Sequence, residues 1–529
     1  MDTKALRQKI LDLAIRGKLV PQDPNDEPAE VLLERIREQK QQMLKEGKLK
    51  KKDIKNDTII FKGEDNLHYE KFQDGTVKCI EDEIPFEVPE GWSWCRLRDL
   101  LNVCSSKRVL QSDWKNEGIP FYRAREIVKL SENDFVENDL FISKEHYLEL
   151  EKNYGIPQSG DLMVSGVGTI GKVYIVKPED QFYYKDASVL CFENRNKMLV
   201  SKFAKILLES SFVQLQMREN SKGTTVDTIT ISAAMNYLCI VPPQNEQVRI
   251  VAAVQQAIVK VNEIQFNKDN LHSTITILKS KILDLAIRGK LVPQDPNDEP
   301  ASVLLERIRA EKEELIKHGK IKRDKKESVI FKGDDNSYYL RTGGVEESLE
   351  DWRFDDLPET WKICCLWELC DYGDCINVNT EDIAEDAWIL DLEDIEKDTG
   401  TVLKKVTKAQ RNSVSTKHKF HSGQVLYSKL RPYLNKVVLS DADGYCTSEI
   451  LPLEFKNCVL PEYARYYLMS GTFIAYANHC SYGVKMPRLG TTDGKKAIFS
   501  LPPLSEQKRI VETIDFCFMQ LNKISEALA

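Results

Sequence analysis

Residues 166–172, Gly-Val-Gly-Thr-Ile-Gly-Lys, have the residue types and spacing of the first seven positions of a phosphate-binding P-loop. The eighth position of such a loop is a serine or threonine that holds magnesium, and here it is Val173. The segment 173–176, VYIV, predicts a β-strand, whereas a P-loop leads into a helix whose N-terminus faces the phosphate. We therefore expect no nucleotide binding at this loop.

Other catalytic patterns are missing from the sequence. Pro242 and Pro243 follow Val241, so the chain lacks the Asn/Asp-Pro-Pro-aromatic motif of amino-methyltransferases. No dinucleotide-type glycine fingerprint stands on a strand–helix turn. The acidic stretch 391–397, DLEDIEK, could mimic a nuclease centre, but no second motif accompanies it. We predict that the chain carries no catalytic residues.

Metal-ligand patterns are equally weak. His418 and His421 have no carboxylate or cysteine at ligand spacing, so we interpret them as surface residues that could face DNA. Four of the 13 cysteines cluster without forming a CxxC pair, namely Cys364, Cys365, Cys370 and Cys375. Reduced, mostly buried thiols are the expectation for this odd and scattered set. We predict no metal site.

Cations and hydroxyls in two loops of the C-terminal half suit DNA binding better than catalysis. Residues 428–436 read Ser-Lys-Leu-Arg-Pro-Tyr-Leu-Asn-Lys, and residues 482–488 read Tyr-Gly-Val-Lys-Met-Pro-Arg. Such side chains donate to phosphates and to base edges. The predicted DNA-binding residues of this half are Ser428, Lys429, Arg431, Tyr433, Lys436, Lys485 and Arg488.

The N-terminal half offers a different set at corresponding places. Its loop 166–172 is rich in glycine, which permits a close approach of the backbone, and residues 221–225, SKGTT, take the place of 482–488. The predicted DNA-binding residues are Lys107, Arg108, Tyr122, Arg123, Arg125, Ser165, Thr169, Lys172, Lys222, Thr224 and Thr225. For any single residue in either half, a solvated turn with an incidental cation is the alternative.

Matching segments must position these loops. Gly160–Met163 precedes the first loop as Gly423–Leu426 precedes the second, and apolar residues follow both, so each half should hold a strand–loop–strand unit. Equivalent loops with different chemistry are typical of two readers of different sequences. Identical loops would imply a palindromic target. Because the two loops differ, we predict an asymmetric target.

An internal repeat frames the two loops. Residues 9–29 recur letter for letter at 281–301, and VLLERIR follows at 31–37 and 303–309. The segments PEGW at 89–92 and PETW at 358–361 match, as do the two Pro-Pro-x-x-Glu-Gln segments that begin at 242 and 502. Between these edges, at 93–240 and 362–500, the copies share little. The border segments of the two copies, here called the frame, are alike, whereas the segments between them differ.

Apolar residues at steps of three and four predict long helices that pair as a coiled coil. The predicted seam consists of Leu6, Ile10, Leu13, Val251, Val254, Ile258, Val261, Leu271, Ile275, Leu278, Ile282, Leu285, Val511, Ile514, Phe518 and Leu521. The rhythm slips at 265–270, which suggests a stammer or local break. The two chain ends would form one split helix antiparallel to the central one, giving a pseudo-twofold, circularly permuted pair. Packing of each helix on its own domain is the alternative.

Composition bounds the partners. The 529 residues predict two to four domains, and 42% hydrophobic with 30% charged residues indicate a folded protein. The N-terminal MDTKALRQK leads into no apolar segment and no stretch is long enough to span a membrane, so we expect a cytoplasmic protein without a membrane partner. The net charge of −8 disfavours DNA binding overall but allows local basic patches. The lysine-rich stretches 48–55 and 317–326 are solvated faces or sites for DNA backbone or an acidic partner.

Together these features resemble the specificity subunit of type I restriction-modification systems. The motifs are ILDLAIRGKLVPQ at 10–22 and 282–294, the two PE-x-W segments, GDLM with GTIGK, VLYSKLRPYLNK, and the two PP-x-x-EQ-x-RIV segments. The resemblance implies an α+β chain with two globular α/β target-recognition domains separated by a long antiparallel coiled coil. The expected domains are 1–79 (N-terminal helix with a helical, basic linker), 80–243 and 350–503 (recognition domains), 244–292 (central helix), 293–349 (the repeated helical, basic linker) and 504–529 (C-terminal helix).

The resemblance also implies what the chain binds. Each recognition domain would read half of a bipartite site in double-stranded DNA. Two methyltransferase subunits would dock on the helices and restriction subunits would join them. S-adenosylmethionine, ATP and magnesium would be bound by those partners and not by this chain. The first domain departs from the second because it lacks the Ser-Lys-Leu-Arg-Pro-Tyr segment. A coiled-coil scaffold that binds proteins without DNA specificity is the alternative function, and a nuclease is a third.

Overall fold

The computed structural model describes residues 2–47, 49, 51–194, 197–221, 227–319, 328–335, 337–349, 357–411 and 414–528. The chain divides into two compact units, residues 1–267 and 268–529, here called unit 1 and unit 2. Both units mix helices and strands, as the sequence predicts. In the described part of the chain, no helix is both long and apolar enough to cross a membrane.

Unit 1 begins and ends with a helix that flanks a linker and a recognition domain. Its elements in chain order are α1 (Thr3–Ile15), α2 (Ala29–Lys45), α3 (Lys51–Ile54), β1 (Ile59–Lys62), β2 (His68–Lys71), β3 (Val77–Cys79), β4 (Ser93–Arg96), α4 (Leu97–Leu100), β5 (Asn102–Cys104), β6 (Ile119–Tyr122), α5 (Ala124–Asn133), β7 (Phe141–Ile142), α6 (Lys144–Tyr154), β8 (Leu162–Ser165), β9 (Val173–Ile175), β10 (Tyr183–Tyr184), β11 (Val189–Glu193), α7 (Ser201–Glu209), α8 (Ser211–Glu219), α9 (Ile231–Met235), β12 (Leu238–Val241) and the first part of α10 (Gln244–Ile287).

Unit 2 follows the same order. After the second part of α10 come α11 (Ala301–Lys317), β13 (Ser328–Lys332), β14 (Tyr338–Thr342), β15 (Val345–Ser348), β16 (Lys362–Cys365), α12 (Leu366–Leu369), β17 (Ile376–Val378), β18 (Ile389–Leu390), β19 (Lys417–Phe420), β20 (Val425–Ser428), β21 (Val437–Leu439), β22 (Gly444–Thr447), β23 (Ile450–Leu453), α13 (Pro461–Leu468), α14 (Gly471–His479), β24 (Ser481–Tyr482), β25 (Arg488–Leu489), α15 (Thr491–Lys496), β26 (Ile498–Leu501) and α16 (Leu504–Leu528).

The recognition domains share a sheet plan despite their different sequences. Strand β8 lies between β9 and β11, and β20 lies between β21 and β23, all antiparallel. Ser165 pairs with Val189 in unit 1, and Ser428 pairs with Ile450 in unit 2. Each domain also has a parallel pair, β6 with β10 and β18 with β22. The predicted boundaries 80–243 and 350–503 enclose β4–β12 and β16–β26.

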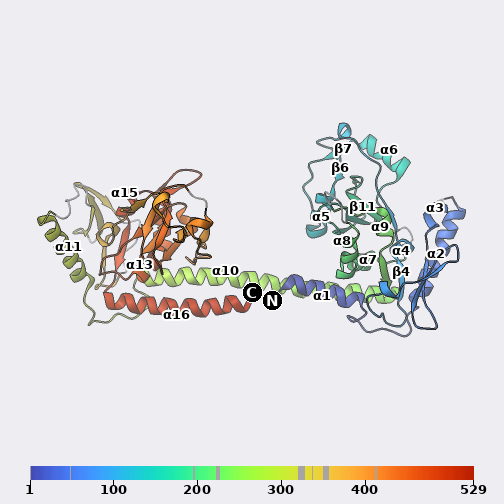
Figure 1. Ribbon diagram of the computed structural model, residues 1–529, viewed down its shortest axis with the longest axis horizontal. Helices are drawn as coiled ribbons and strands as arrows, with labels where there is room; N and C mark the ends of the chain where they lie inside the picture. The colour runs from blue at the N-terminus through green and yellow to red at the C-terminus, as the bar shows by residue number, and fades with distance from the viewer. Residues whose placement is uncertain are drawn as a thin grey trace. The chain divides into compact units, whose positions relative to one another are not determined.

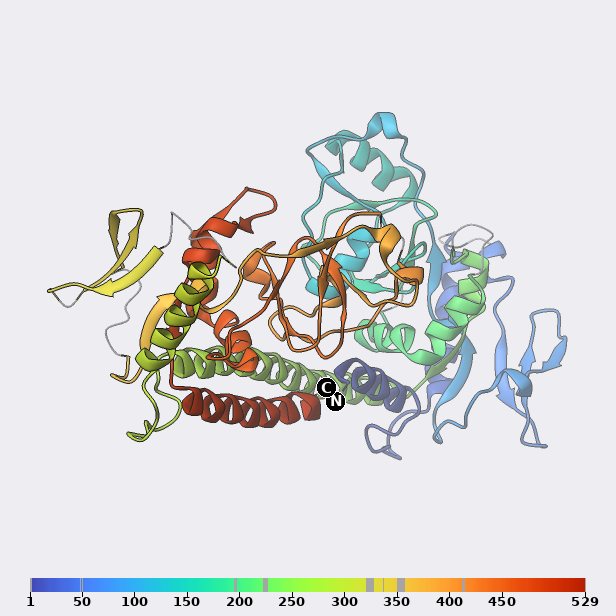
Figure 2. The same ribbon diagram turned by 60° about the vertical axis from the view of Figure 1, so that its left-hand side comes forward.

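Each linker adds a three-stranded antiparallel sheet, β1–β3 in unit 1 and β13–β15 in unit 2. In Figure 2 the sheet β13–β15, drawn in yellow, lies at the edge of unit 2 beside α11. One face carries a stacked aromatic pair in each copy, with ring centroids 5.9 Å apart for Phe61–Tyr69 and 5.8 Å for Phe331–Tyr339. The repeated amino-acid sequence of the two linkers therefore forms the same structure in both units.

The repeated frame is held by the same hydrogen bonds in both units. The indole N–H of Trp92 donates to Glu246 over 2.9 Å, and that of Trp361 donates to Glu506 over 2.9 Å. Arg249 pairs with Asp26 over 2.6 Å as Arg509 pairs with Asp298 over 2.7 Å. These contacts join the PE-x-W segments, the repeated loops and the helix starts that the sequence comparison singled out.

A glycine is required where the first helix of each frame ends. Gly17 and Gly289 have φ of +64° and +66°, which glycine adopts without strain. A Cβ at these positions would lie 2.2 Å from Pro89 Cγ and 2.4 Å from Pro358 Cγ. The glycine of the repeated Arg-Gly-Lys sequence thus lets the PE-x-W segment pack directly against the helix end.

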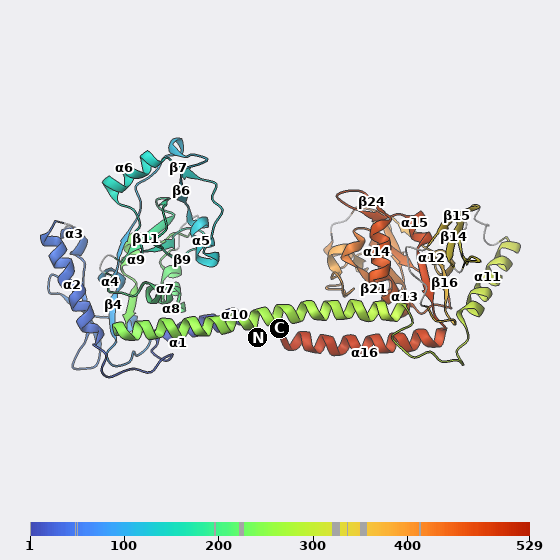
Figure 3. The same ribbon diagram turned by 180° about the vertical axis from the view of Figure 1, so that it is seen from behind.

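The helices pair antiparallel inside each unit (Figures 1 and 3). Thr3 Oγ1 donates to Gln265 Oε1 over 2.5 Å, and Gln22 Nε2 donates to Glu246 Oε1 over 3.1 Å at the other end of the pair. In unit 2, Lys279 Nζ donates to Asn522 Oδ1 over 2.6 Å. The predicted pairing of α1 and α16 with α10 is confirmed.

The same helices also pack on their own recognition domains, so the alternative interpretation holds as well. Asp12 of α1 accepts hydrogen bonds from the Ser211 N–H over 3.0 Å and the Ser211 hydroxyl over 2.6 Å. Phe518 of α16 packs edge-on against Tyr466, with ring centroids 5.8 Å apart. One core in each unit therefore includes both helix and domain residues.

Burial of the predicted seam is uneven. Ile10, Val251, Val254, Val261, Ile275 and Ile514 are buried, and Leu6, Leu13, Ile258, Ile282, Val511, Phe518 and Leu521 are half-buried. Leu271, Leu278 and Leu285 are exposed, so their assignment to the seam is wrong. The buried stripe of α10 runs through Ile275, Leu283 and Ala286, with the half-buried Ile282 beside it. At roughly 100° per residue, Leu278 and Leu285 lie about a quarter turn to one side of it.

Of the two alternatives for residues 265–270, the local break is wrong, because α10 is continuous over its 44 residues, and the stammer stays a prediction. Residues 265–270, Gln-Phe-Asn-Lys-Asp-Asn, contain neither proline nor glycine. Polar residues without a breaker can stay helical when solvated, so the loss of apolar rhythm changes what the helix packs on and not whether it forms.

Candidate nucleic-acid interface

In both units two loops that are distant in sequence meet beside the central strand of the recognition sheet. In unit 1 the Ile229 N–H donates to the Gly166 carbonyl over 2.9 Å, and Val167 bridges Thr228. In unit 2 the Leu489 N–H donates to the Lys429 carbonyl over 3.0 Å, and Leu430 bridges Arg488. The strand–loop–strand prediction is confirmed. The structure adds that in unit 2 the second predicted loop lies against the first, and that in unit 1 Thr228 and Ile229 lie against the first loop.

Ser165 and Ser428 end the two central strands and are buried. The Ser165 hydroxyl donates to the Thr169 carbonyl over 2.6 Å and accepts from the Lys172 N–H over 2.9 Å. The Ser428 hydroxyl donates to the Leu430 carbonyl over 2.9 Å. Both predictions of DNA contact are wrong for these serines, because the hydroxyls shape the turns from inside.

The 428–436 loop of unit 2 has a strained and well-anchored backbone. Arg431 and Asn435 take left-handed conformations, with φ of 50° and 49°. The Arg431 N–H donates to the Pro487 carbonyl over 2.7 Å, and its Nη2 donates to the Lys485 carbonyl over 3.4 Å. Tyr433 is half exposed at the outer side of the turn. The loop is therefore held in one shape before any ligand binds.

Two predicted cations of unit 2 are used inside the protein. Lys436 Nζ donates to the Leu392 carbonyl over 2.6 Å, and burial lowers the pKa of this lysine. Arg488 forms a forked pair with Glu449 at 2.8 and 3.1 Å, which raises the pKa of the guanidinium. The DNA contact predicted for Lys436 stays a prediction, because one hydrogen bond to a carbonyl leaves the other N–H groups of its ammonium group available. Lys429 and Lys485 form no ion pair with any described residue, so their charges remain to face an anion.

The predicted cations of unit 1 mostly have carboxylate partners. Arg123 and Arg125 share Glu126 and Asp139, with Arg125 Nη2 2.6 Å from Asp139 Oδ2. Lys172 Nζ lies 3.0 Å from Glu132 Oε1. Arg108 is exposed and lies 4.0 Å from Asp186, whereas Lys107 lies over the Tyr154 ring at 5.4 Å. Charge on this surface is therefore largely compensated.

The remaining predicted residues of unit 1 have mixed outcomes. Tyr122 is half-buried against Phe182, with ring centroids 4.8 Å apart, and burial raises its pKa. Thr169 is exposed in the glycine-rich loop. Lys222, Thr224 and Thr225 lie outside the described residues. The strand predicted after this loop, which argued against a P-loop, is present as β9.

The histidines and the acidic stretch have structural roles. His418 is buried, and its Nδ1 lies 2.8 Å from the Ile450 carbonyl, so its interpretation as a surface residue is wrong. His421 is exposed and lies 2.7 Å from Glu454. Arg411 binds Asp391, Glu393 and Asp394, which ties the acidic stretch to the fold. Among described residues, no group of three or more His, Cys, Asp or Glu is arranged to hold a metal ion.

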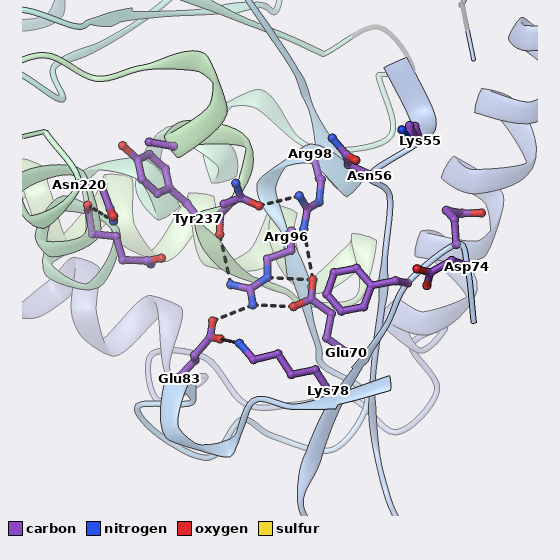
Figure 4. A pocket seen from close by; sticks show the side chains of 15 residues that line it. Lys55, Asn56, Glu70, Asp74, Lys78, Glu83, Arg96, Arg98, Asn220 and Tyr237 are labelled. Atoms are coloured by element: carbon purple, nitrogen blue, oxygen red, sulfur yellow. Dashed lines mark hydrogen bonds and ion pairs between the residues drawn. The ribbon is translucent and has the colours of Figure 1, made fainter. Parts of the chain in front are cut away.

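A polar hollow of about 870 Å³ lies between the β1–β3 linker sheet and the recognition domain of unit 1 (Figure 4). Its floor is an ion-pair network in which Arg96 Nη2 lies 2.7 Å from both Glu70 and Glu83, and Arg98 Nη2 lies 3.2 Å from Glu70. Burial raises the pKa of Glu70, but hydrogen bonds from Arg96 and Thr58 outweigh it and leave the pKa below its ordinary value. Since the cations are matched by carboxylates, this network joins linker to domain and does not mark a ligand site.

Sequence reasoning missed an exposed apolar tip beside the unit 2 cations. Val484 and Met486 are exposed in the turn between β24 and β25, and Tyr482 is exposed at the end of β24. The sequence signal for this tip is three apolar residues at alternate positions, 482, 484 and 486, beside Gly483 and Pro487.

The chain matches known proteins over most of its length. The family described as type I restriction modification DNA specificity domain covers residues 89–271 and 358–527. The specificity subunits of the type I restriction enzymes EcoAI and EcoEI of Escherichia coli are 28% and 25% identical, over 98% and 99% of this chain and 90% of each relative. A further relative, the MjaIX specificity subunit of Methanocaldococcus jannaschii, is 30% identical over 31% of this chain and 37% of its own.

A solved structure supports the fold. A chain described under complex assembly and conformational transition of the type I R-M system superposes with a TM-score of 0.55 at 16% identity, covering 84% of this chain and 94% of that chain. At this identity the likeness concerns the fold alone. The family match spans more than half of the sequence and falls on both repeated units, with their paired loops and matched frames. The chain belongs to the DNA specificity subunits of type I restriction-modification systems.

Proposed function

We propose that this chain is the non-catalytic subunit that reads an asymmetric, bipartite site in double-stranded DNA, each recognition domain reading one half. One observation carries the proposal. The paired loops have the same backbone bonds in both units, at Gly166 with Ile229 and at Lys429 with Leu489, but different side chains. A common support that presents different donors suits two readers of different base sequences.

The proposed partners are two methyltransferase subunits, which dock on the conserved helices, and restriction subunits that join them. Apolar side chains on these helices are exposed. In unit 1 they include Val248, Val259 and Phe266, and in unit 2 they include Ile277, Leu278, Leu285, Phe516 and Met519. Exposed apolar residues on a soluble helix pair favour a protein partner. The reactions would use S-adenosylmethionine, ATP and magnesium bound by the partner subunits.

A domain exchange tests the two-reader proposal. Residues 93–240 are replaced by the corresponding domain of a relative, and the methylated bases are mapped in a host that carries the methyltransferase subunits. We expect one half of the methylated sequence to change and the other to stay the same. A change in both halves, or methylation without sequence preference, would contradict the proposal.

A helix insertion tests whether α10 sets the spacing between the half-sites. Four residues inserted after Asn267 lengthen the helix by about 6 Å. We expect a different number of base pairs between the methylated halves, with both halves unchanged. An unchanged number of base pairs between the methylated halves would show that the helix does not set this spacing.

The alternative is a coiled-coil scaffold that binds proteins without DNA specificity. The exposed apolar residues on α10 and α16 are compatible with it. Salt-sensitive binding of the purified complex to a bipartite site, with much weaker binding to a scrambled site, favours the DNA reader. Equal binding to both sites favours the scaffold, and metal-dependent cleavage by the isolated chain would point to a nuclease.

A further inference from the structure

Strands β24 and β25 and the turn between them, residues 481–489, are here called the tip hairpin. Ser481 pairs with Leu489 and Tyr482 with Arg488, so the two strands are short and most of the hairpin is turn. Val484 is fully exposed at 102%, with Tyr482 at 61% and Met486 at 44%. In Figure 3 strand β24 lies at the end of the domain that is remote from α10.

Folding gives no reason for apolar residues at this place. A valine that stays fully exposed buries no surface and so contributes no hydrophobic stabilisation. A turn needs glycine at Gly483, where φ is +98°, but it does not need valine or methionine beside it. Exposed apolar side chains gathered on one protruding turn are typical of a contact surface.

The tip hairpin is braced from below. Leu430 bridges Arg488, the Arg431 N–H donates to the Pro487 carbonyl over 2.7 Å, and the forked Arg488–Glu449 pair holds the base of β25. A turn fixed by backbone bonds on both sides loses little conformational entropy when it binds. The apolar side chains are therefore presented in a defined position.

The surroundings match the charge of DNA. Lys485 lies within the turn and Lys429 lies in the loop that braces it, and neither forms an ion pair with a described residue. Phosphates flank every groove, so cations next to an apolar tip suit a groove contact. In unit 1 the corresponding sequence, 221–229, is Ser-Lys-Gly-Thr-Thr-Val-Asp-Thr-Ile, in which Lys222 and Thr224 stand where Tyr482 and Val484 stand in unit 2.

The major groove offers one apolar feature to such a tip, the C5-methyl group of thymine. We propose that Val484 and Met486 contact thymine methyl groups in the half-site read by unit 2. This inference rests on the proposed DNA-reading function and deepens it, because it names a base feature that unit 2 recognises.

Deoxyuridine substitution tests the contact directly, since uracil pairs like thymine but lacks the methyl group. The assembled complex of this chain with its methyltransferase subunits is titrated with its mapped target. Each thymine of either half-site is replaced singly by deoxyuridine. For at least one position in the unit 2 half-site we expect about four-fold weaker binding, which corresponds to about 0.8 kcal/mol for one buried methyl group.

A variant then links the loss to the hairpin. Val484→Ala with Met486→Ala should bind the natural site more weakly and should bind thymine and deoxyuridine sites equally. The matched control is Val345→Ala on β15 of the same unit, a 72% exposed valine outside the recognition domain, which should keep the four-fold discrimination.

Three results would overturn the inference: a unit 2 half-site without thymine on either strand, equal binding of wild type to all thymine and deoxyuridine sites, or discrimination that persists in the double variant. These results differ from failure of the proposed function itself. In that case the complex would bind a scrambled site as tightly as the mapped one.

Discussion

Glu70, Arg96 and Arg98 of unit 1 occupy the positions that Leu340, Cys365 and Trp367 occupy in unit 2. Glu70 pairs with Ile60 across the linker sheet as Leu340 pairs with Ile330, and Arg96 pairs with Leu238 as Cys365 pairs with Ile498. In unit 1 the three side chains form an ion-pair network, whereas in unit 2 Leu340 and Cys365 belong to an apolar cluster. One backbone thus accepts a charged or an apolar junction between linker and domain.

The neighbouring lysine changes its role with the junction. Lys40 of unit 1 donates to Asp57 over 2.9 Å, while its counterpart Lys312 in unit 2 lies 4.0 Å above the Trp367 ring. By contrast, the bonds of Trp92 and Trp361 to the helix starts are the same in both units. The contacts of the PE-x-W tryptophans with the helix starts are therefore the same in both units. The side chains at the junction and in the recognition loops differ between the units.

The largest effect is expected from breaking the charged junction. Glu70→Leu leaves the Arg96 guanidinium buried without its main partner and should destabilise unit 1 by about 3–5 kcal/mol. The triple change Glu70→Leu, Arg96→Cys, Arg98→Trp copies unit 2 and should recover most of that loss. Urea denaturation of the full chain, with hydrogen exchange to locate the change, measures both. A triple variant as unstable as the single one would show that the two junctions are not interchangeable.

The second prediction concerns the shared frame. The Gln247 side chain accepts from the Val200 N–H and donates to the Pro242 carbonyl, and Gln507 does the same with Leu460 and Pro502. Gln247→Ala and Gln507→Ala each leave buried backbone groups unpaired and should each cost about 2 kcal/mol.

The informative quantity is the difference between these two costs, measured by urea denaturation as above. Equal losses of stability would support the view that the same contacts hold the border segments in both units. A clear inequality would mean that one unit compensates where the other cannot. Gln244→Ala, in the same turn of α10 but exposed, is the control and should cost much less.

The third prediction compares cations of the two recognition surfaces. Lys485→Ala removes a charge that has no described carboxylate partner and should weaken DNA binding by about 1 kcal/mol and lower the salt slope by about 0.9. Lys172→Ala removes a charge already paired with Glu132 and should change both quantities less. Titrations at several salt concentrations measure this, and an equal loss for both variants would mean that DNA displaces Glu132.

The smallest effect is a pH dependence in unit 2. Burial lowers the pKa of His418 below the usual histidine value of 6.5. The unfolded chain therefore binds this proton more readily than the folded one, so stability falls as pH drops through 6.5. Strands β19 and β23 should exchange faster at pH 5.5 than at pH 7.5 after correction for intrinsic rates, and His418→Gln should reduce the difference.

Acid should act differently on the junction of unit 1. Burial and the nearby Asp57 raise the pKa of Asp99 to about 6, so its proton is bound more tightly in the folded chain and stabilises it as pH falls. Exchange in β4 should therefore not accelerate over the same pH range. Faster exchange in both regions at pH 5.5 would indicate general acid unfolding.

The sequence alone predicted the parts that depend on local pattern. The repeat located the border segments of each unit, and matching apolar segments on both sides of the loops located the strands around 162–175 and 425–439. Apolar residues at steps of three and four located the long helix, and the differing loops indicated two domains that read different sequences. Local patterns can do this because strand and helix formation depend mainly on nearby residues and on which face is apolar. The resemblance to a specificity subunit rested on the same motifs and is confirmed.

Only the tertiary structure decided which predicted side chains are available. Arg488 meets Glu449, Lys172 meets Glu132 and Lys436 meets the Leu392 carbonyl, each across about 40 residues of sequence. Ser165 and Ser428 turn inward, while Val484 turns outward. The charge of a lysine or arginine is the same in every sequence, but whether a carboxylate or a carbonyl already satisfies it depends on chain segments that come together only when the protein folds.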